Sequence, residues 1–200
     1  MSRRTRLTAA WRWAAVVVLG AALVAAARAQ YVSEPAPGVL LVAADQMVDP
    51  RFSHSVVLLI QHDDSGSWGV IINKPTGVSV GEVLPALKNS GSSSKVYFGG
   101  PVEVDHILCL YRDAADQSNP SAGLPDVHWS ASEKTLKAHL GTPGLLRVYA
   151  GYAGWAPGQL EFEIAHGGWK MIQGRGANVF SDDPEDLWQK LSGTLGGIPI

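Results

Sequence analysis

Apolar residues along this chain fall into short runs that are separated by polar, glycine-rich and proline-rich stretches. Continuous apolar runs of about four to eight residues are typical of buried strands, whereas apolar positions repeated every three or four residues are typical of amphipathic helices. The runs predict strands at residues 38–44, 56–62, 68–73, 95–100, 106–112, 145–151 and 169–174. Helical spacing and capping signals predict helices near residues 80–87, 130–141, 157–167 and 182–191.

The order of these elements predicts an α+β fold built around one sheet. Residues 63–67 place a glycine-containing link between two apolar runs, which is the pattern of a β-hairpin. Hairpins together with separated helices are typical of α+β folds rather than of doubly wound sheets. Residues 113–130 are rich in Asp, Ser, Pro and Gly and predict a surface loop that leads to a short edge strand near Trp129. A length of 200 residues suits a single domain with a short extension.

The extension is N-terminal and has the pattern of a secretory signal peptide. Four arginines precede an uncharged apolar run at residues 13–27, and the small residues of Ala27-Arg28-Ala29 provide a cleavage pattern. The run is shorter than the ~20 residues of a membrane-spanning helix, which favours cleavage after Ala29 over anchoring in the inner membrane. We therefore expect residues 1–29 to be a signal peptide, residues 30–37 to be a flexible lead-in, and the mature protein to be periplasmic, with no membrane span.

Cleavage would make the protein acidic. The full chain has 16 basic and 18 acidic residues, and residues 1–29 contain five of the arginines and no acidic residue. The mature chain would then have 11 basic and 18 acidic residues, a net charge of −7. Nucleic-acid binding needs a basic surface that displaces counterions from phosphates, and Lys134 and Lys137 are the nearest approach to one. The charge balance therefore argues against DNA or RNA as a partner.

Residues 77–81 have the G-x-S-x-G spacing of a hydrolase nucleophile elbow. An elbow serine directly follows a strand, whereas three residues separate the predicted strand from Gly77. Glu82 lies three residues after Ser79 at the start of an apolar helical pattern, which is the spacing of a capping box. We interpret Ser79 as a helix cap. A small serine hydrolase that uses Ser79, or another serine with a histidine, remains the alternative.

Two further features have chemical potential but an ordinary explanation. His62, Asp63 and Asp64 are suitable metal ligands, yet three adjacent residues seldom converge on one ion and the stretch suits a hairpin turn. Cys109 is the only cysteine, so no intrachain disulfide can form, and its apolar surroundings predict a small buried residue. The sequence predicts neither a metal site nor a cofactor.

Two turns carry residues with binding potential. Arg51, in the stretch DPRF at residues 49–52, could capture an anion or form a structural salt bridge, and we favour the salt bridge. The glycines of FGGPV at residues 98–102 and of GYAGWAPGQLEFE at residues 151–163 permit tight turns or close backbone contacts. We expect the second stretch to end a strand at Gly151 and to begin a helix near Pro157, with a binding groove as the second interpretation.

Three separated stretches make the chain resemble the AlgH/YqgE family of bacterial proteins. They are DPRFSHSVVLLIQHDDSGSWGVIINKP at residues 49–75, VYFGGPV at 96–102 and GYAGWAPGQLEFEI at 151–164, and the pair Leu187-Trp188 also fits. The resemblance implies one domain at residues 38–191, a barrel-like, mostly antiparallel sheet with helices outside, and a loose tail at 192–200. Some relatives are described as transcriptional regulators, but the resemblance carries no catalytic residues.

The leading hypothesis is an exported, non-enzymatic binding or regulatory protein with an unknown protein or small-molecule partner. A purely structural role in an envelope assembly is a further alternative, and direct transcriptional regulation requires that the export signal be non-functional. We expect a groove where glycine turns meet polar and aromatic residues from distant segments. Its candidate residues are Asp49, Arg51, Asn73, Gly99, Gly100, Pro101, Tyr152, Trp155 and Gln159.

Overall fold

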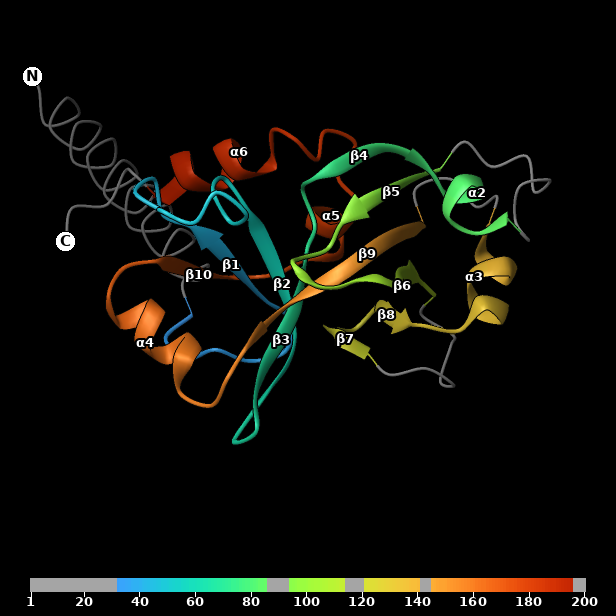
Figure 1. Cartoon of the computed structure of the whole chain (residues 1–200). Helices are drawn as coiled ribbons and strands as arrows, with labels where there is room; N and C mark the ends of the chain where they lie inside the picture. Colours follow the sequence, from blue (N-terminus) through green and yellow to red (C-terminus); the bar gives the residue numbers. More distant parts are fainter. Residues whose placement is uncertain (1–31, 86–93, 114–120, 141–144, 196–200) are drawn as a thin grey trace, which may run out of the picture.

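A computed structural model describes residues 32–85, 94–113, 121–140 and 145–195 (Figure 1). The predicted signal peptide, most of the sequence between α2 and β5, and the last five residues lie outside these ranges. No helix within them is both long and apolar enough to cross a bilayer.

Within the described ranges, ten strands form one curled sheet. Its order is β10-β1-β2-β3-β9-β6-β8-β7, and β4 joins it through β5, which pairs with β9. At the end of this order β7 returns to contact β2. The strands are β1 (Val39–Ala43), β2 (Val56–Asp63), β3 (Gly66–Ile71), β4 (Pro75–Ser79), β5 (Lys95–Phe98), β6 (Val102–Arg112), β7 (Ser121–Leu124), β8 (Val127–Ser130), β9 (Leu146–Trp155) and β10 (Trp169–Gln173).

The sheet is a half-barrel in which the strand pairs described are antiparallel, except for β5 with β9. Strand β9 connects its two halves: Leu146 to Tyr152 pairs with β6, and the end of the strand pairs with β3. Figure 1 shows β9 as a long strand that crosses from the side of α3 to the side of α4. The predicted barrel-like α+β architecture is confirmed.

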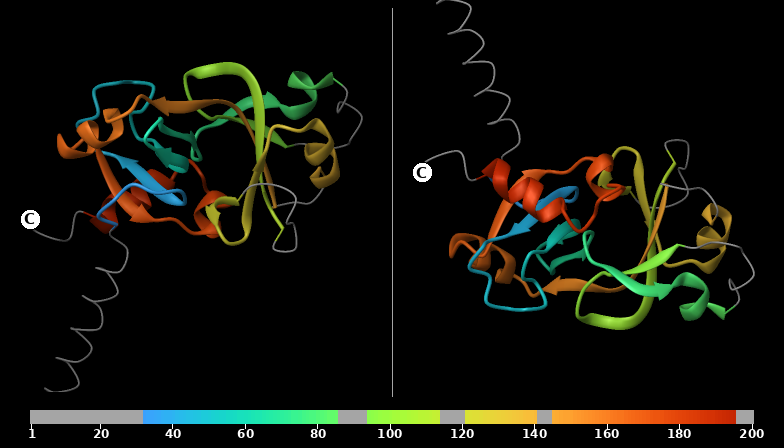
Figure 2. Two further views of the ribbon diagram at one scale, coloured as in Figure 1. Left: turned by 90° about the horizontal axis from the view of Figure 1, so that it is seen from below. Right: turned by 90° about the horizontal axis from the view of Figure 1, so that it is seen from above.

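In the part of the chain that the structure describes, five short helices lie outside the sheet (Figure 2). α4 contacts β3 and β10, and α6 contacts β1, where the Trp188 indole N–H donates to the Ala43 carbonyl at 2.8 Å. The helices are α2 (Val80–Val83), α3 (Glu133–His139), α4 (Gln159–Ala165), α5 (Gly176–Val179) and α6 (Leu187–Leu195).

Strands β1 and β2 carry core residues on both faces. All of β1 and the first five residues of β2 are buried. Leu40 and Leu58 belong to one apolar cluster, whereas Leu41 and Leu59 belong to a second cluster that α4 covers through Leu160. Burial on both faces explains why the apolar runs in these strands are continuous rather than alternating.

Two strands lie where the sequence predicts none. β4 and β7 are short and contain glycine with few apolar residues, so they give no strand pattern; each is held by pairing with one neighbour, β5 or β8. β7 falls in residues 113–130, so the interpretation of that whole region as a surface loop is wrong for residues 121–124. The expected edge strand near Trp129 is present as β8.

Several predicted element ends are displaced. α3 starts later than the predicted position 130, because Ser130 ends β8 and Ser132 is the N-cap of α3. α6 begins at Leu187, after a turn that its N–H closes onto the Pro184 carbonyl at 3.1 Å, and not at the predicted position 182. It continues to Leu195, into the segment predicted to be a tail. β9 also continues past Gly151 to Trp155, because β3 pairs with its end.

Candidate functional site

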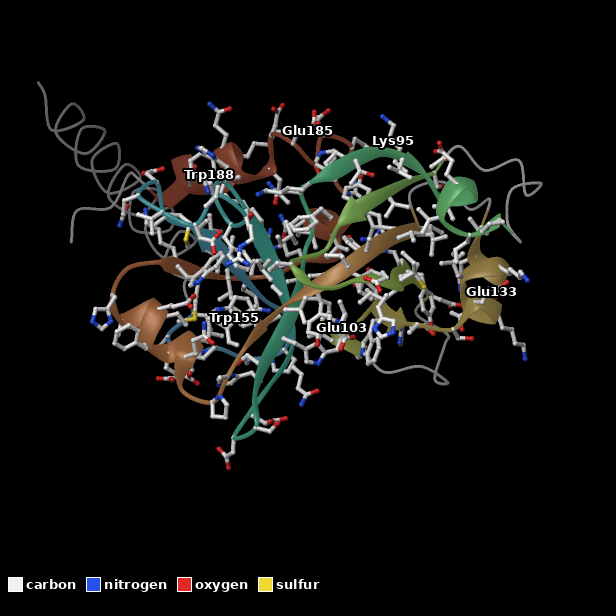
Figure 3. All side chains as sticks on the ribbon, viewed as in Figure 1. Lys95, Glu103, Glu133, Trp155, Glu185 and Trp188 are labelled. Atoms are coloured by element: carbon white, nitrogen blue, oxygen red, sulfur yellow. The ribbon has the colours of Figure 1, made fainter. Side chains whose placement is uncertain are left out.

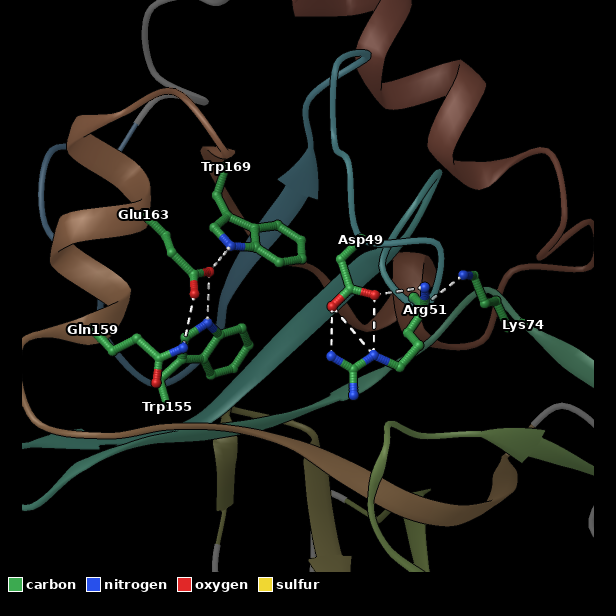
Figure 4. A network of polar contacts seen from close by, with 7 residues as sticks. All are labelled: Asp49, Arg51, Lys74, Trp155, Gln159, Glu163 and Trp169. Atoms are coloured by element: carbon green, nitrogen blue, oxygen red, sulfur yellow. Dashed lines mark hydrogen bonds and ion pairs between the residues drawn. The ribbon is translucent and has the colours of Figure 1, made fainter.

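The stretch GYAGWAPGQLEFE carries strand β9 into helix α4 and fixes the junction with side-chain hydrogen bonds (Figure 4). One oxygen of Glu163 accepts from the indole N–H groups of Trp155 at 3.0 Å and of Trp169 at 2.8 Å. Its other oxygen accepts from the Gln159 amide at 2.9 Å. Both indoles are nearly buried, so these bonds satisfy donors that would otherwise be costly. Trp155 and Gln159, two of the predicted groove residues, therefore have structural partners.

The turn DPRF forms a separate polar cluster. The guanidinium of Arg51 donates to both carboxylate oxygens of Asp49, at distances from 2.7 to 3.2 Å, and lowers the pKa of Asp49. Lys74 donates to the Arg51 carbonyl at 2.9 Å. The structural salt bridge favoured for Arg51 is present, on an exposed surface. Phe52 packs on the Trp155 ring at 6.2 Å and links this turn to the α4 junction.

The other predicted groove residues support the backbone. Asn73 is buried, accepts from the Val56 N–H at 2.8 Å and donates to the His54 carbonyl at 2.9 Å. Gly99 and Gly100 are also buried, because FGGPV crosses directly over β9. A Cβ on Gly99 would lie 2.2 Å from the Gly151 carbonyl oxygen, so the close crossing requires glycine there. Pro101 follows in the turn that leads to β6.

A cleft of about 990 Å³ lies beside this crossing, between the β2–β3 hairpin, the first part of β6 and strands β8 and β9. Tyr152 and Trp155 are the two predicted groove residues that line it. Asp49, Arg51, Asn73 and Gln159 do not, nor do the two glycines and the proline of FGGPV. The structure therefore divides the predicted groove into the cleft, the salt-bridged turn and a structural crossing. The polar and aromatic residues that line the cleft include Gln61, Ser67, Trp68, Glu103, Trp129 and Tyr152.

Three aromatic rings line the cleft, and the ring of Trp68 contacts the other two. The Trp68 ring meets the Trp129 ring edge to face at a centroid distance of 5.0 Å and the Tyr152 ring at 5.9 Å. The Trp68 indole N–H donates to the Gln61 side chain at 3.0 Å. All three rings are partly exposed. Their packing preorganises a wall that is apolar yet accessible, as in many ligand sites.

A wide bulge of β6 forms the rim of the cleft. Val102 pairs with Tyr152 and Ile107 with Ala150, so residues 103–106 lie opposite the single residue Gly151. Gly151 has a φ of +70°, and a Cβ there would lie 2.8 Å from the Val102 carbonyl oxygen. The missing side chain makes room for the bulge, which brings the polar stretch EVDH to the surface.

Glu103 is the strained residue of this rim. Its φ is +47°, in the left-handed region that costs a non-glycine residue roughly 1 kcal/mol. The carboxylate is in close contact with Nδ1 of His106, and Asp105 lies between them on the exposed bulge. Figure 3 shows Glu103 and Trp155 on the two sides of the β2–β3 hairpin, whereas Trp188 lies on α6. Strain that persists at the edge of a cleft is a reason to examine the residue for function.

One serine and one histidine of the cleft region are arranged as in a nucleophilic relay. Ser67 Oγ lies 2.8 Å from Nδ1 of His62, and Nε2 of the same ring lies 3.5 Å from the Glu161 carboxylate. Ser79, in contrast, donates its hydroxyl and its backbone N–H to Glu82, each at 2.7 Å. The interpretation of Ser79 as the cap of α2 is confirmed.

The other residues with metal-binding or nucleophilic potential are held in local contacts or buried. Asp63 accepts from the Ser65 hydroxyl, from the Ser65 N–H at 2.8 Å and from Gln61 at 2.6 Å, which stabilises the hairpin turn and lowers the pKa of Asp63. Within the described ranges, no three His, Cys, Asp or Glu side chains are grouped so that they could hold a metal ion. Cys109 is fully buried, as predicted, and burial raises its pKa to about 12, so it is not poised as a nucleophile.

The sequence analysis missed Trp68, Trp129 and Glu103. Trp68 and Trp129 lie in short β segments where a tryptophan is unremarkable, and only the pairing of distant strands brings their rings together. The stretch VEVDH gave a usable signal: three titratable residues directly precede an apolar strand and follow the glycine pair. From the sequence, this stretch is only a link between two predicted strands. It forms a bulge because Gly151 on the facing strand has no side chain.

Known proteins resemble this chain over most of its length. The family model described as AlgH-like matches residues 40–199. The UPF0301 protein SCO2948 of Streptomyces coelicolor is 40% identical over 161 residues, which cover 77% of this chain and 83% of that protein. A UPF0301 protein of Myxococcus xanthus is 37% identical over 171 residues, 82% of this chain and 91% of the relative.

Two solved structures share the fold. The crystal structure of protein DIP2367 from Corynebacterium diphtheriae has a TM-score of 0.68 and 28% identity, and the match covers 82% of this chain and 89% of that one. The solution structure of the AlgH protein from Pseudomonas aeruginosa has a TM-score of 0.64 and 29% identity, with 84% and 94% covered.

Proposed function

We propose a binding function for this protein, which belongs to the AlgH-like family: it holds a ligand in the cleft beside the β6 bulge without transforming it chemically. The names of its relatives specify neither a reaction nor a substrate. The cleft carries the proposal, since its volume of about 990 Å³ is in the range of ligand sites and its aromatic wall is joined by a few polar groups.

The arrangement of the lining favours binding over catalysis. The rings of Trp68, Trp129 and Tyr152 come from three different strands, and Trp68 contacts both of the other rings, so they offer a preformed surface. A preformed surface reduces the ordering cost that a ligand must offset on binding. Glu103 and Gln61 supply polar groups at the edge.

Nuclear magnetic resonance on the ¹⁵N-labelled protein tests this function with a panel of amino acids, short peptides, sugars and small organic ions. A binding compound should shift the indole N–H signals of Trp68 and Trp129 and leave in place that of Trp188, which lies on α6 and donates to the Ala43 carbonyl. The variant Trp129→Phe should weaken binding, whereas Phe162→Leu, which alters an exposed ring outside the cleft, should not. Shifts centred on Lys74 and Arg51, or none with any compound, would contradict the proposal.

Export is part of the same proposal. The basic start, short apolar run and Ala27-Arg28-Ala29 pattern of the sequence support it, and the acidic character of the remaining chain argues against DNA contact. N-terminal sequencing of protein from fractionated host cells should give a start at Gln30 in the periplasmic fraction. An intact Met1 in the cytoplasm would contradict export and restore direct transcriptional regulation as an alternative.

Hydrolysis is a second candidate because of the Ser67–His62–Glu161 arrangement, in which Ser67 lines the cleft. It ranks behind binding since Ser67 is only 7% exposed and lies within a strand that is paired on both sides, not on an open turn. If this relay acts, the protein should cleave nitrophenyl esters, and Ser67→Ala should abolish cleavage. The absence of turnover on a broad ester and peptide panel would exclude it.

A further inference from the structure

We infer that the cleft takes an extended basic peptide segment of a partner protein, with an arginine or lysine side chain between the aromatic wall and the β6 bulge. The inference rests on the proposed binding function and specifies its ligand. Three independent features lead to it: the charge of the rim, the aromatic wall, and the unpaired backbone of the bulge.

The charge of the cleft is negative. Glu103 and Asp105 belong to its lining, and no lysine or arginine does. His106 is the one lining residue that can carry a positive charge, and it is held against Glu103. Asp63 and Asp64 adjoin Ser65 at the tip of the neighbouring hairpin. A cationic side chain would therefore enter a field of complementary sign, and an anionic ligand would be repelled.

The aromatic wall favours the same kind of side chain. Indole and phenol rings attract ammonium and guanidinium groups over their faces, and tryptophan does so most strongly. Trp68, Trp129 and Tyr152 provide such rings next to the carboxylate rim. Arginine, whose planar guanidinium can stack on a ring and bind a carboxylate at its edge, fits this combination best.

The backbone of the bulge indicates a peptide rather than a small cation. Residues 103–106 have no ladder partner on β9, and the pairing of β6 with β8 starts only at Cys109. The bulge is exposed on the rim, so an extended chain that lies along it could form main-chain hydrogen bonds with it. Peptide recognition commonly combines such main-chain bonds with pockets for alternate side chains. Val104, which is 52% exposed in the bulge, adds an apolar contact.

Fluorescence anisotropy with the intact protein and a labelled peptide, Gly-Arg-Gly-Arg-Gly, tests the inference. The matched peptide replaces both arginines with citrulline, which keeps the shape of the side chain and removes its charge. The arginine peptide should bind at least about tenfold more tightly, and this difference should shrink in high salt. Equal binding of the two peptides, or no binding of the arginine peptide, would overturn the inference.

Substitutions in the protein test whether the arginine peptide binds at the carboxylates of the cleft rim. Glu103→Gln with Asp105→Asn should weaken binding of the arginine peptide about fivefold to tenfold, since exposed ion pairs contribute modestly. Glu185→Gln with Asp186→Asn makes the same charge change on exposed residues outside the cleft and should leave binding within about twofold. Equal affinities of the two double variants would overturn the inference.

The two proposals can fail separately. If the citrulline peptide or a neutral compound binds as tightly and Trp129→Phe weakens it, the cleft is a binding site but its ligand is not selected by charge. If no compound shifts the indole signals of Trp68 and Trp129, the binding function itself fails.

Discussion

Glu163 should be the most important single acceptor at the junction between β9 and α4. Its carboxylate accepts from two indole donors whose residues, Trp155 and Trp169, are 6% and 3% exposed. Replacement by alanine leaves both donors without their acceptor. A buried unsatisfied donor costs ~1–3 kcal/mol, and water can reach part of this half-buried site, so Glu163→Ala should reduce the free energy of unfolding by about 2–4 kcal/mol. Domains are stable by ~5–15 kcal/mol, so this loss is large.

Two further variants separate the effect of the lost hydrogen bonds on stability from the general effect of replacing a glutamate in α4. Glu163→Gln retains one carbonyl oxygen and loses the charge, so it should cost about 1–2 kcal/mol. Glu161→Ala removes a glutamate from the same helix whose side chain is 48% exposed and lies 3.5 Å from His62, and it should cost less than about 1 kcal/mol. Urea unfolding followed by circular dichroism measures all three differences.

A double-mutant cycle with Trp169→Phe tests the reasoning directly. If the indole bond at 2.8 Å stabilises the junction, Glu163→Ala and Trp169→Phe should be coupled by about 1–2 kcal/mol. A stability of Glu163→Ala within about 0.5 kcal/mol of the parent protein, or a coupling near zero, would refute the assigned role of the network.

Gly151→Ala should destabilise the protein by at least about 2 kcal/mol, because φ is +70° and the new Cβ would lie 2.5 Å from the Gly100 carbonyl oxygen. Gly154→Ala, in the same strand, is the control. Its Cβ meets only an ordinary contact at 3.4 Å, so it should change stability by less than about 1 kcal/mol. Thermal unfolding distinguishes the two. The thiol of Cys109, whose pKa is about 12, should react with iodoacetamide only after unfolding; labelling of the native protein would contradict its burial. Arg51→Ala should raise the pKa of Asp49 toward 3.8, as measured by NMR titration. Because the folded-state pKa of Asp49 is lowered, the pair stabilises the protein above the unfolded-state pKa, and this small contribution is lost as pH falls through the folded-state value.

Patterns that depend on burial alone were readable from the sequence. The continuous apolar runs of β1 and β2 predicted buried strands, and the spacing of Ser79 and Glu82 predicted a cap, because each signal is local. β4 and β7 were not predicted, because pairing with a neighbouring strand, and not their own residue pattern, gives them their strand conformation.

The site was only partly predictable for the same reason. Glycine composition marked Gly99 and Gly151 as special, but glycine permits both exposed turns and close crossings, and only the three-dimensional structure shows a crossing. Tyr152 and Trp155 line the cleft, and their partners in it come from β3, β6 and β8. Contacts across strands so far apart in sequence have no local signal.

A crystal structure of the protein with the peptide Gly-Arg-Gly-Arg-Gly would test the proposed peptide site most directly. We expect an extended peptide along the β6 bulge, with one guanidinium against Trp68 or Trp129 and within reach of the Glu103 or Asp105 carboxylate. A peptide bound elsewhere, for example at Asp63 and Asp64 on the hairpin tip, with the aromatic cleft empty, would contradict it.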